Sequence, residues 1–389
     1  MIATSTIDLF SDDVLAEPYP HYAALREQGP VVHLSHHDLY AVPRHDDVRQ
    51  VLSDPEVFCS GQGVGLNALI NAIGPGTTLM SDGDAHDRQR EVIGRPLTPK
   101  ALSGLRPEAE ALATALVDEL MERGSFDAVA DLAEVIPATW VPDLLGWPTE
   151  GRDRLLDWAS DNFDALGPDN ERSAAAGAGL LEMVVYARHV AERDDLPVSS
   201  MAAGVLAAAD RGDITHAQCP MLLVDYLAPS LDTTISALGN AIWLFGEHPD
   251  QWDLLRREPA RIKNAFNEVL RVETPISCFT RVTTAPAELG GERLPTGARI
   301  LVMFASANRD ERRWERADEF DITREAAGQL AFGHGTHACA GMGLARMEGT
   351  AVLAALARRV QRFELGPPVR KLNNLIRSFR SLPVTVHPV

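Results

Sequence analysis

The chain has 389 residues, of which 45% are hydrophobic, and its 36 basic and 55 acidic side chains leave a formal net charge of −19. The apolar fraction is ample for a large core, while the acidic balance argues against nucleic acid as a partner, because phosphate binding requires a basic surface. No stretch of about 18 apolar residues occurs, so the sequence predicts no membrane-spanning helix. Met1 to Pro18 carries four acidic residues and no basic one, a composition unlike a signal peptide, and we expect a cytoplasmic protein.

The four cysteines are widely spaced and form no CxxC pair, which argues against a disulfide scaffold. No Gly/Ser-rich or Pro-rich linker divides the chain. We therefore predict a single domain over residues 1–389.

The first part of the chain predicts a short helix over Pro20–Glu27 and strands over Val31–Leu34 and Leu39–Val42. From Ala85 to about Asp250 the apolar residues recur at helical spacing. The last helix of this region begins after a Thr215 cap and ends near Glu247.

Further along, the pattern predicts a helix over Pro259–Val272 and strands over Arg281–Thr284 and Ala298–Phe304, with a turn at Gly290-Gly291 between them. The segment Asn308–Gly328 has no clear period and indicates ordered coil.

A helix is expected over Met342–Arg362, and the tail Leu375–Val386 alternates like a hairpin. The predicted fold class is mainly α with small peripheral β-sheets.

The run Phe332-Gly333-His334-Gly335-Thr336-His337-Ala338-Cys339-Ala340-Gly341 carries the strongest chemical signal. Gly335 and Gly341 can adopt positive φ and let the backbone approach a flat ligand. Cys339 lies just before a predicted helix, where the dipole and free N–H groups favour a thiolate that can bind iron. The alternatives are a buried apolar cysteine and a metal site made by His334, His337 and Cys339.

Continued to Leu344-Ala345-Arg346, this run resembles the haem-binding signature of the cytochrome P450 family, and the order of elements along the chain is also similar to that fold. The resemblance implies haem b, with Cys339 as the axial iron ligand and with Phe332 and Gly341 beside the cofactor.

Three residues form a predicted brace behind the cofactor. Glu268 and Arg271 lie three apart on one helix face, within reach of each other, although an ordinary surface ion pair has the same spacing. The family resemblance implies that the pair is buried and bonded to Arg324.

Another set of residues is expected to hold the haem propionates. His86 and Arg90 are four apart and project from one helix face, a suitable clamp for a carboxylate. By resemblance, Arg281 and His337 match the other two positions that contact propionates. Taken singly, each of the four is more typical of an ordinary surface residue, and their joint placement reverses that interpretation.

Leu227-Ala228-Pro229-Ser230-Leu231-Asp232-Thr233-Thr234 resembles the oxygen-activation motif of the family, which implies that Thr233 bonds dioxygen and that Asp232 connects a proton-delivering water chain. The segment departs from the motif at Pro229-Ser230. Because Pro229 cannot donate to the Asp225 carbonyl, we expect the helix to kink there, and we expect Ser230 to order a water or contact oxygen.

The loop Phe58–Leu66 is similar to that of bacterial enzymes that demethylate para-methoxybenzoates, but Gln62 and Asp225 stand where that subfamily has arginines. A buried acid repels an anion, so a neutral aromatic substrate is expected. The residues assigned to the substrate pocket are Gln62, Leu66, Asp225, Pro229, Ser230, Ile276 and Phe279.

The resulting hypothesis is a haem-thiolate monooxygenase that hydroxylates or O-demethylates a small aromatic, with electrons from NAD(P)H through ferredoxin reductase and ferredoxin. Arg88, Arg95 and Lys100 form a candidate basic patch for the ferredoxin, or merely a solvated face. The alternatives are a peroxide-driven or oxidative-coupling haem-thiolate enzyme and a non-catalytic haem-binding sensor.

Overall fold

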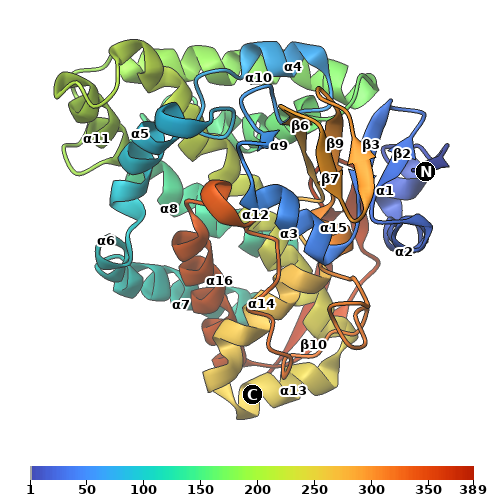
Figure 1. Cartoon of the computed structure of the whole chain (residues 1–389). Coiled ribbons are helices and arrows are strands. Elements are labelled where there is room, and N and C mark those ends of the chain that lie inside the picture. Colours follow the sequence, from blue (N-terminus) through green and yellow to red (C-terminus); the bar gives the residue numbers. More distant parts are fainter. Residues whose placement is uncertain (1) are drawn as a thin grey trace.

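The computed structural model describes residues 2–389, and Figure 1 shows strands gathered on one side of the molecule and helices over the rest. The helices are α1 (Asp12–Ala16), α2 (Tyr19–Gln28), α3 (His45–Ser53), α4 (Ala68–Ile73), α5 (Gly83–Gly94), α6 (Pro99–Ser103), α7 (Arg106–Arg123), α8 (Val135–Leu145), α9 (Leu155–Ala165), α10 (Glu171–Ala191), α11 (Met201–Asp210), α12 (Cys219–Glu247), α13 (Pro249–Arg257), α14 (Ile262–Val272), α15 (Phe304–Ala307) and α16 (Met342–Arg359). The expected fold class, mainly α with small peripheral sheets, is confirmed.

The strands are β1 (Ala3–Ser5), β2 (Val32–Leu34), β3 (Leu39–Val42), β4 (Phe58–Cys59), β5 (Ser125–Asp127), β6 (Phe279–Thr283), β7 (Ala287–Leu289), β8 (Glu292–Leu294), β9 (Arg299–Val302), β10 (Val360–Leu365), β11 (Val369–Lys371), β12 (Ser378–Ser381) and β13 (Pro383–Pro388). The largest sheet has the order β1-β2-β3-β9-β6-β4, and β1 runs parallel to β2. The predicted turn joins β7 to β8, where Gly290 and Gly291 have φ of 56° and 81°. Positive φ is the reason that this turn requires glycine.

The helix α12 crosses the core and contacts α8, α9, α10, α14 and α16. A single 3-10 turn, His216–Gln218, precedes it, and Gln218 Oε1 accepts the Thr215 N–H at 2.8 Å as a cap. The long helix expected from Thr215 to Glu247 is therefore confirmed.

Two predictions about the C-terminal part were wrong in detail. The helix expected to reach Arg362 ends at Arg359, because Val360 begins β10. The tail expected over Leu375–Val386 is not a hairpin: β12 pairs with β11, while β13 pairs with β10 and β5. Alternation predicts strands but does not identify their partners.

Candidate functional site

The loop before α16 is a tight turn whose shape depends on two glycines. Gly333 and Gly335 have φ of 69° and 68°, and a Cβ on Gly335 would lie 2.3 Å from the Leu52 carbonyl oxygen. The Cys339 N–H donates to the Phe332 carbonyl at 2.8 Å and closes the loop. The expectation of positive φ at Gly341 was wrong: its φ is −82°, and it caps α16.

The Cys339 sulfur faces a large internal cavity. Burial raises the pKa of its thiol, while the N–H groups of Gly341 and Met342 and the cations Arg90 and Arg346 act in the opposite direction. These four groups favour a negative sulfur, as expected just before a helix.

Two histidines lie in contact beside the cysteine loop. The His86 and His337 rings are 4.3 Å apart between centroids, and among the described residues neither buried Nε2 atom has a hydrogen-bond partner. Burial, with Arg281 and His86 nearby, holds the pKa of His337 well below its usual range, so its imidazole is neutral. The carboxylate of Asp82 lies 3.7 Å from His337 Nε2, beyond hydrogen-bond length. Two buried imidazole nitrogens without a hydrogen bond indicate that a polar ligand belongs there.

Two arginines line the same side of the cavity. Arg90 donates to the Ala338 carbonyl of the cysteine loop, and Arg281 donates to the Thr280 carbonyl at 2.8 Å. Arg281 is 3% exposed, and burial lowers its pKa to about 10. A buried cation without a carboxylate partner at hydrogen-bond distance favours an anion, such as a propionate.

Much of the remaining cavity lining comes from α12, from the first residue of β6 and from the residues just before it. Of the residues assigned to the substrate, five line the cavity: Asp225, Pro229, Ser230, Ile276 and Phe279. Thr233 also lines it, and its hydroxyl donates to the Pro229 carbonyl at 2.7 Å.

Comparison with known proteins decides the family. The sequence profile of the Cytochrome P450 family matches residues 178–385. Cytochrome p450 CYP199A2 of Rhodopseudomonas palustris is 40% identical over 387 residues, which cover 98% of this chain and 94% of that protein. The chain belongs to the cytochrome P450 family. It is a P450 monooxygenase, and the cofactor of the family is haem b.

Other P450s are similar over the same extent. Vitamin D(3) 25-hydroxylase of Pseudonocardia autotrophica is 31% identical, with 99% of this chain and 98% of that protein covered. The crystal structure of CalO2 superposes with a TM-score of 0.86 at 31% identity and covers 98% of this chain and 99% of that one.

The residues of this P450 fit haem. Cys339, His337, Arg90 and Arg281 all line the cavity. Among the described residues the His337 Nε2 has no hydrogen-bond partner, and Arg281 is buried while Arg90 is half-buried. Gly341 also lines the cavity, and a Cβ there would lie 4.0 Å from the Cys339 sulfur, at ordinary van der Waals distance. Phe332 also lines the cavity, and the Arg346 guanidinium lies 4.9 Å from its ring centroid.

Glu268, Arg271 and Arg324 form a buried network. Arg271 Nε and Nη2 bond the two Glu268 carboxylate oxygens at 2.7 and 2.8 Å, and Arg324 Nε reaches Glu268 at 3.1 Å. Arg271 also donates to carbonyl oxygens at Asn308 and Ala317, in the segment before the cysteine loop. Glu268 and Arg271 are both fully buried, so the network ties α14 to that coil.

The two residues of the oxygen-activation motif point in different directions. Thr233 faces the cavity, whereas Asp232 does not line it and pairs with Lys371 at 3.3 Å. Burial raises the pKa of Asp232, and its Oδ2 has no hydrogen-bond partner among the described residues. Asp232 therefore lies beside the cavity wall rather than in the cavity.

The segment around Pro229 stays helical. Ser230 donates its hydroxyl hydrogen to the Tyr226 carbonyl, so only its lone pairs remain to accept a bond from a water in the cavity. The expected kink stays a prediction.

Two residues assigned to the substrate pocket lie elsewhere. Gln62 is exposed on a loop that turns at Gly63, whose φ is 94°. Leu66 lines a separate surface depression, and its N–H donates to the Leu166 carbonyl at 2.9 Å. The assignment failed because the turn at Gly63 directs this part of the loop away from the cavity.

Sequence reasoning missed a buried acid. Glu348 lines the cavity, its Oε2 is 3.5 Å from the Thr234 hydroxyl, and burial raises its pKa to about 8. The signal was present in the sequence: Glu348 lies four residues from Leu344 and from Val352, both buried, so helical spacing places it on the inward face.

Proposed function

We propose that this P450 hydroxylates or O-demethylates a small, uncharged aromatic compound, and that its electrons come from NAD(P)H through a ferredoxin reductase and a ferredoxin. The proposal rests on one observation above others. Of the described cavity residues, the cationic side chains of Arg90 and Arg281 lie beside the cysteine loop and His337, while α12 contributes the buried carboxyl of Asp225, whose charge interacts with that of Arg90.

In this proposal Cys339 holds the iron, and His86, Arg90, Arg281 and His337 hold the propionates. When bound, haem supplies the redox chemistry that transfers one oxygen atom from dioxygen. The protein binds and orients the reactants around it.

The proton path on the distal side uses this chain's own groups. Thr233 Oγ1 faces the cavity and can accept a hydrogen bond from water while its own hydrogen is donated to the Pro229 carbonyl. Asp232 has a buried oxygen free for a water and an ion pair to Lys371, which is half-buried toward solvent. We infer that Asp232 moves protons from the Lys371 side toward Thr233.

Substrate charge is selected by Asp225. Its Oδ2 accepts the Thr78 N–H at 2.6 Å, and burial raises its pKa to about 7. At neutral pH it is about half ionised, so it disfavours a carboxylate ligand but accepts a hydrogen bond from a phenol. Gln62 lies outside the cavity and does not contribute to this selection.

Resemblance to the para-methoxybenzoate-demethylating subfamily supports an aromatic substrate, and the apolar lining is consistent with it. Ile276, Phe279, Val141 and Leu144 are among the residues that enclose the space. A compact hydrophobic ligand matches such a wall.

A spectral titration tests the substrate class. Purified ferric protein is titrated with para-methoxybenzoate and with its uncharged analogues, para-methoxyphenol and the methyl ester, and the Soret shift is followed. We expect a saturable shift with an uncharged compound at concentrations where the benzoate gives none. Tight binding of the benzoate would contradict the proposal and return the substrate to the subfamily's acids.

A further inference from the structure

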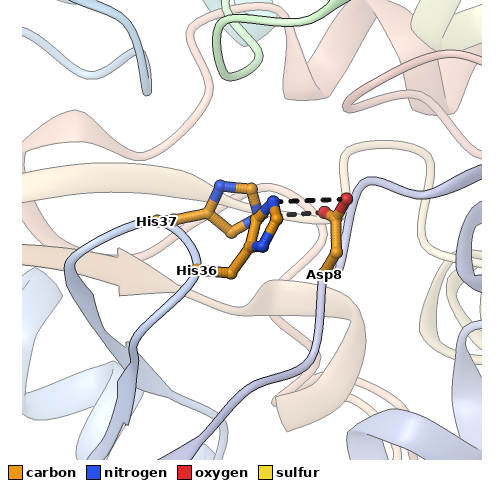
Figure 2. A group of neighbouring side chains, drawn as sticks. All are labelled: Asp8, His36 and His37. Carbon is orange, nitrogen blue, oxygen red and sulfur yellow. Dashed lines mark hydrogen bonds and ion pairs between the residues drawn. The ribbon is translucent and has the colours of Figure 1, made fainter.

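A second group of metal-ligating side chains lies far from the cysteine in sequence, in the N-terminal part of the molecule. Asp8, His36 and His37 present one ligand atom each, and these atoms all lie within 4.8 Å of one another. Figure 2 shows both imidazoles directed at the Asp8 carboxylate. The P450 activity proposed above uses none of these three residues and does not explain why they converge.

The sheet topology brings these residues together. In the parallel pair β1 and β2, Ser5 is the register partner of Leu34, and the Ser35 N–H donates to the Ser5 carbonyl at 3.0 Å. Because parallel strands leave a sheet in the same direction, Asp8 after β1 and His37 after β2 emerge side by side. The site is therefore built by the backbone and does not depend on two mobile surface chains meeting.

The distances suit a small divalent cation. His37 Nε2 is 3.0 Å from Asp8 Oδ1, and His36 Nε2 is 3.6 Å from Asp8 Oδ2, beyond hydrogen-bond length. Ligand atoms around a tetrahedral zinc ion, with bonds near 2.0–2.1 Å, are separated by about 3.3 Å. The two measured separations, which end on different oxygens of Asp8, lie on either side of that value.

The surroundings favour binding as well. The His37 ring makes an edge contact with Phe10 at 5.2 Å between centroids and is only 10% exposed, so its orientation is held. Asp8 Oδ1 also accepts the Phe10 N–H at 2.9 Å, which positions the carboxylate.

Asp8, His36 and His37 line the surface depression that Leu66 also lines. Its lining includes further carboxylates, those of Asp12, Asp169 and Glu171, together with Arg172, which pairs with Asp12. The excess of negative charge attracts a cation. Two histidines and one carboxylate leave a fourth coordination position, open on the solvent side through His36, which is 54% exposed.

We propose that Asp8, His36 and His37 form a zinc-binding site that joins the segment after β1 to the turn after β2. The two imidazole Nε2 atoms and one carboxylate oxygen coordinate the ion, and water completes the tetrahedron. The bound ion cross-links the edge of the main sheet beside the loop that leads into α10.

The test is calorimetric titration of the chelator-treated holoenzyme with zinc chloride. We expect one saturable equivalent per chain. Asp8→Asn, His36→Gln and His37→Gln should each weaken the affinity by at least about tenfold, since even indirect partners of a metal ligand contribute that much. Thermal unfolding with zinc should shift upward only where the site is intact.

His216→Gln is the matched control. His216 Nε2 lies 3.2 Å from Asp210, both are well exposed, and no second imidazole among residues 2–389 completes a site there. Its zinc affinity should equal that of the unmodified protein. His36 is half-exposed, so His36→Gln should fold, and an unchanged Soret band verifies this. The absence of a saturable equivalent, or full affinity retained in His36→Gln, would overturn the proposal.

Discussion

At the scale of single residues, the cavity is defined by where its few charges stand. Arg90, Arg281 and His337 gather on the side of Cys339, whereas Asp225 and Glu348 are acids whose pKa burial raises. A buried ionisable group without a partner costs free energy, so the positions of these groups indicate which ligands the cavity can bind. The two arginines suit anionic propionates, and we propose that Asp225 favours an uncharged substrate.

Asp225 makes anion binding depend on pH. Its pKa is raised to about 7, so the carboxyl is ionised at pH 8 and neutral at pH 6. Affinity for para-methoxybenzoate, which stays ionised over this range, should therefore rise by about tenfold as the pH falls from 8 to 6. Soret titrations across that range measure it.

Asp225→Asn provides the comparison, because an amide oxygen can still accept the Thr78 N–H. In this variant the affinity for the benzoate should not change with pH. The affinity for the methyl ester should not change with pH in either protein. A slope that survives in Asp225→Asn would assign the effect to another group.

His86 and His337 are expected to hold haem. Each has a buried Nε2 without a hydrogen-bond partner among the described residues. A hydrogen bond to a charged group contributes about 1.5–3 kcal/mol, so His86→Gln or His337→Gln should speed haem loss by about 10–100-fold. Transfer of haem to apomyoglobin measures the rate. His216→Gln, a change at an exposed histidine, should leave the rate unaltered.

At the scale of elements, the brace behind the site depends on one buried ion pair. Glu268 accepts bonds from Arg271 and Arg324, and Arg271 in turn satisfies backbone carbonyls at Asn308 and Ala317. A coil without regular hydrogen bonding needs such side-chain donors. The network thus replaces secondary structure in the segment that leads to the cysteine loop.

Breaking this pair should be costly. Glu268→Gln leaves the Arg271 charge buried with a neutral partner, so the free energy of unfolding should fall by about 3–5 kcal/mol. Glu258→Gln is the matched change, since Glu258 also pairs with an arginine three residues on but is 48% exposed. It should cost under about 1 kcal/mol. Urea denaturation of the holoenzyme compares the two, and equal losses would contradict the assigned role.

At the scale of the whole molecule, the net charge is −19, so a local basic patch is a candidate binding surface for an acidic partner. Of the proposed patch, Arg88 and Lys100 are exposed, while Arg95 is engaged by Glu91 and Asp213. α6, which carries Lys100, packs against α16 on the cysteine side. We therefore propose this patch as the binding surface for the electron donor. Among the described residues, no helix is long and apolar enough to cross a membrane.

Reversing these charges should slow electron delivery. Arg88→Glu combined with Lys100→Glu should lower the rate of haem reduction by reduced ferredoxin by about tenfold at low salt, with a smaller effect as ionic strength rises. The control is Arg380→Glu, at an exposed position on β12. Stopped-flow absorbance gives the rates. Equal slowing in both variants would locate the partner elsewhere, and turnover with peroxide alone would favour the peroxide-driven alternative.

Much of this P450 was accessible from contiguous residues. The glycines and Cys339 of residues 332–341, the spacing of Glu268 and Arg271, and the caps of α12 each encode local geometry, because neighbouring residues constrain one another directly. The haem-thiolate class follows from such motifs. The single-domain prediction and the roles of the individual site residues stay predictions.

Other features required the folded chain. Placing Gln62 and Leu66 outside the cavity, pairing β12 with β11, and bringing Asp8 beside His36 all involve segments whose contacts are distant in sequence. Local patterns carry almost no information about such pairings, since they depend on which surfaces become buried against each other when the chain folds. The proposed preference for an uncharged substrate likewise depends on the folded chain, because burial created by tertiary packing raises the pKa of Asp225.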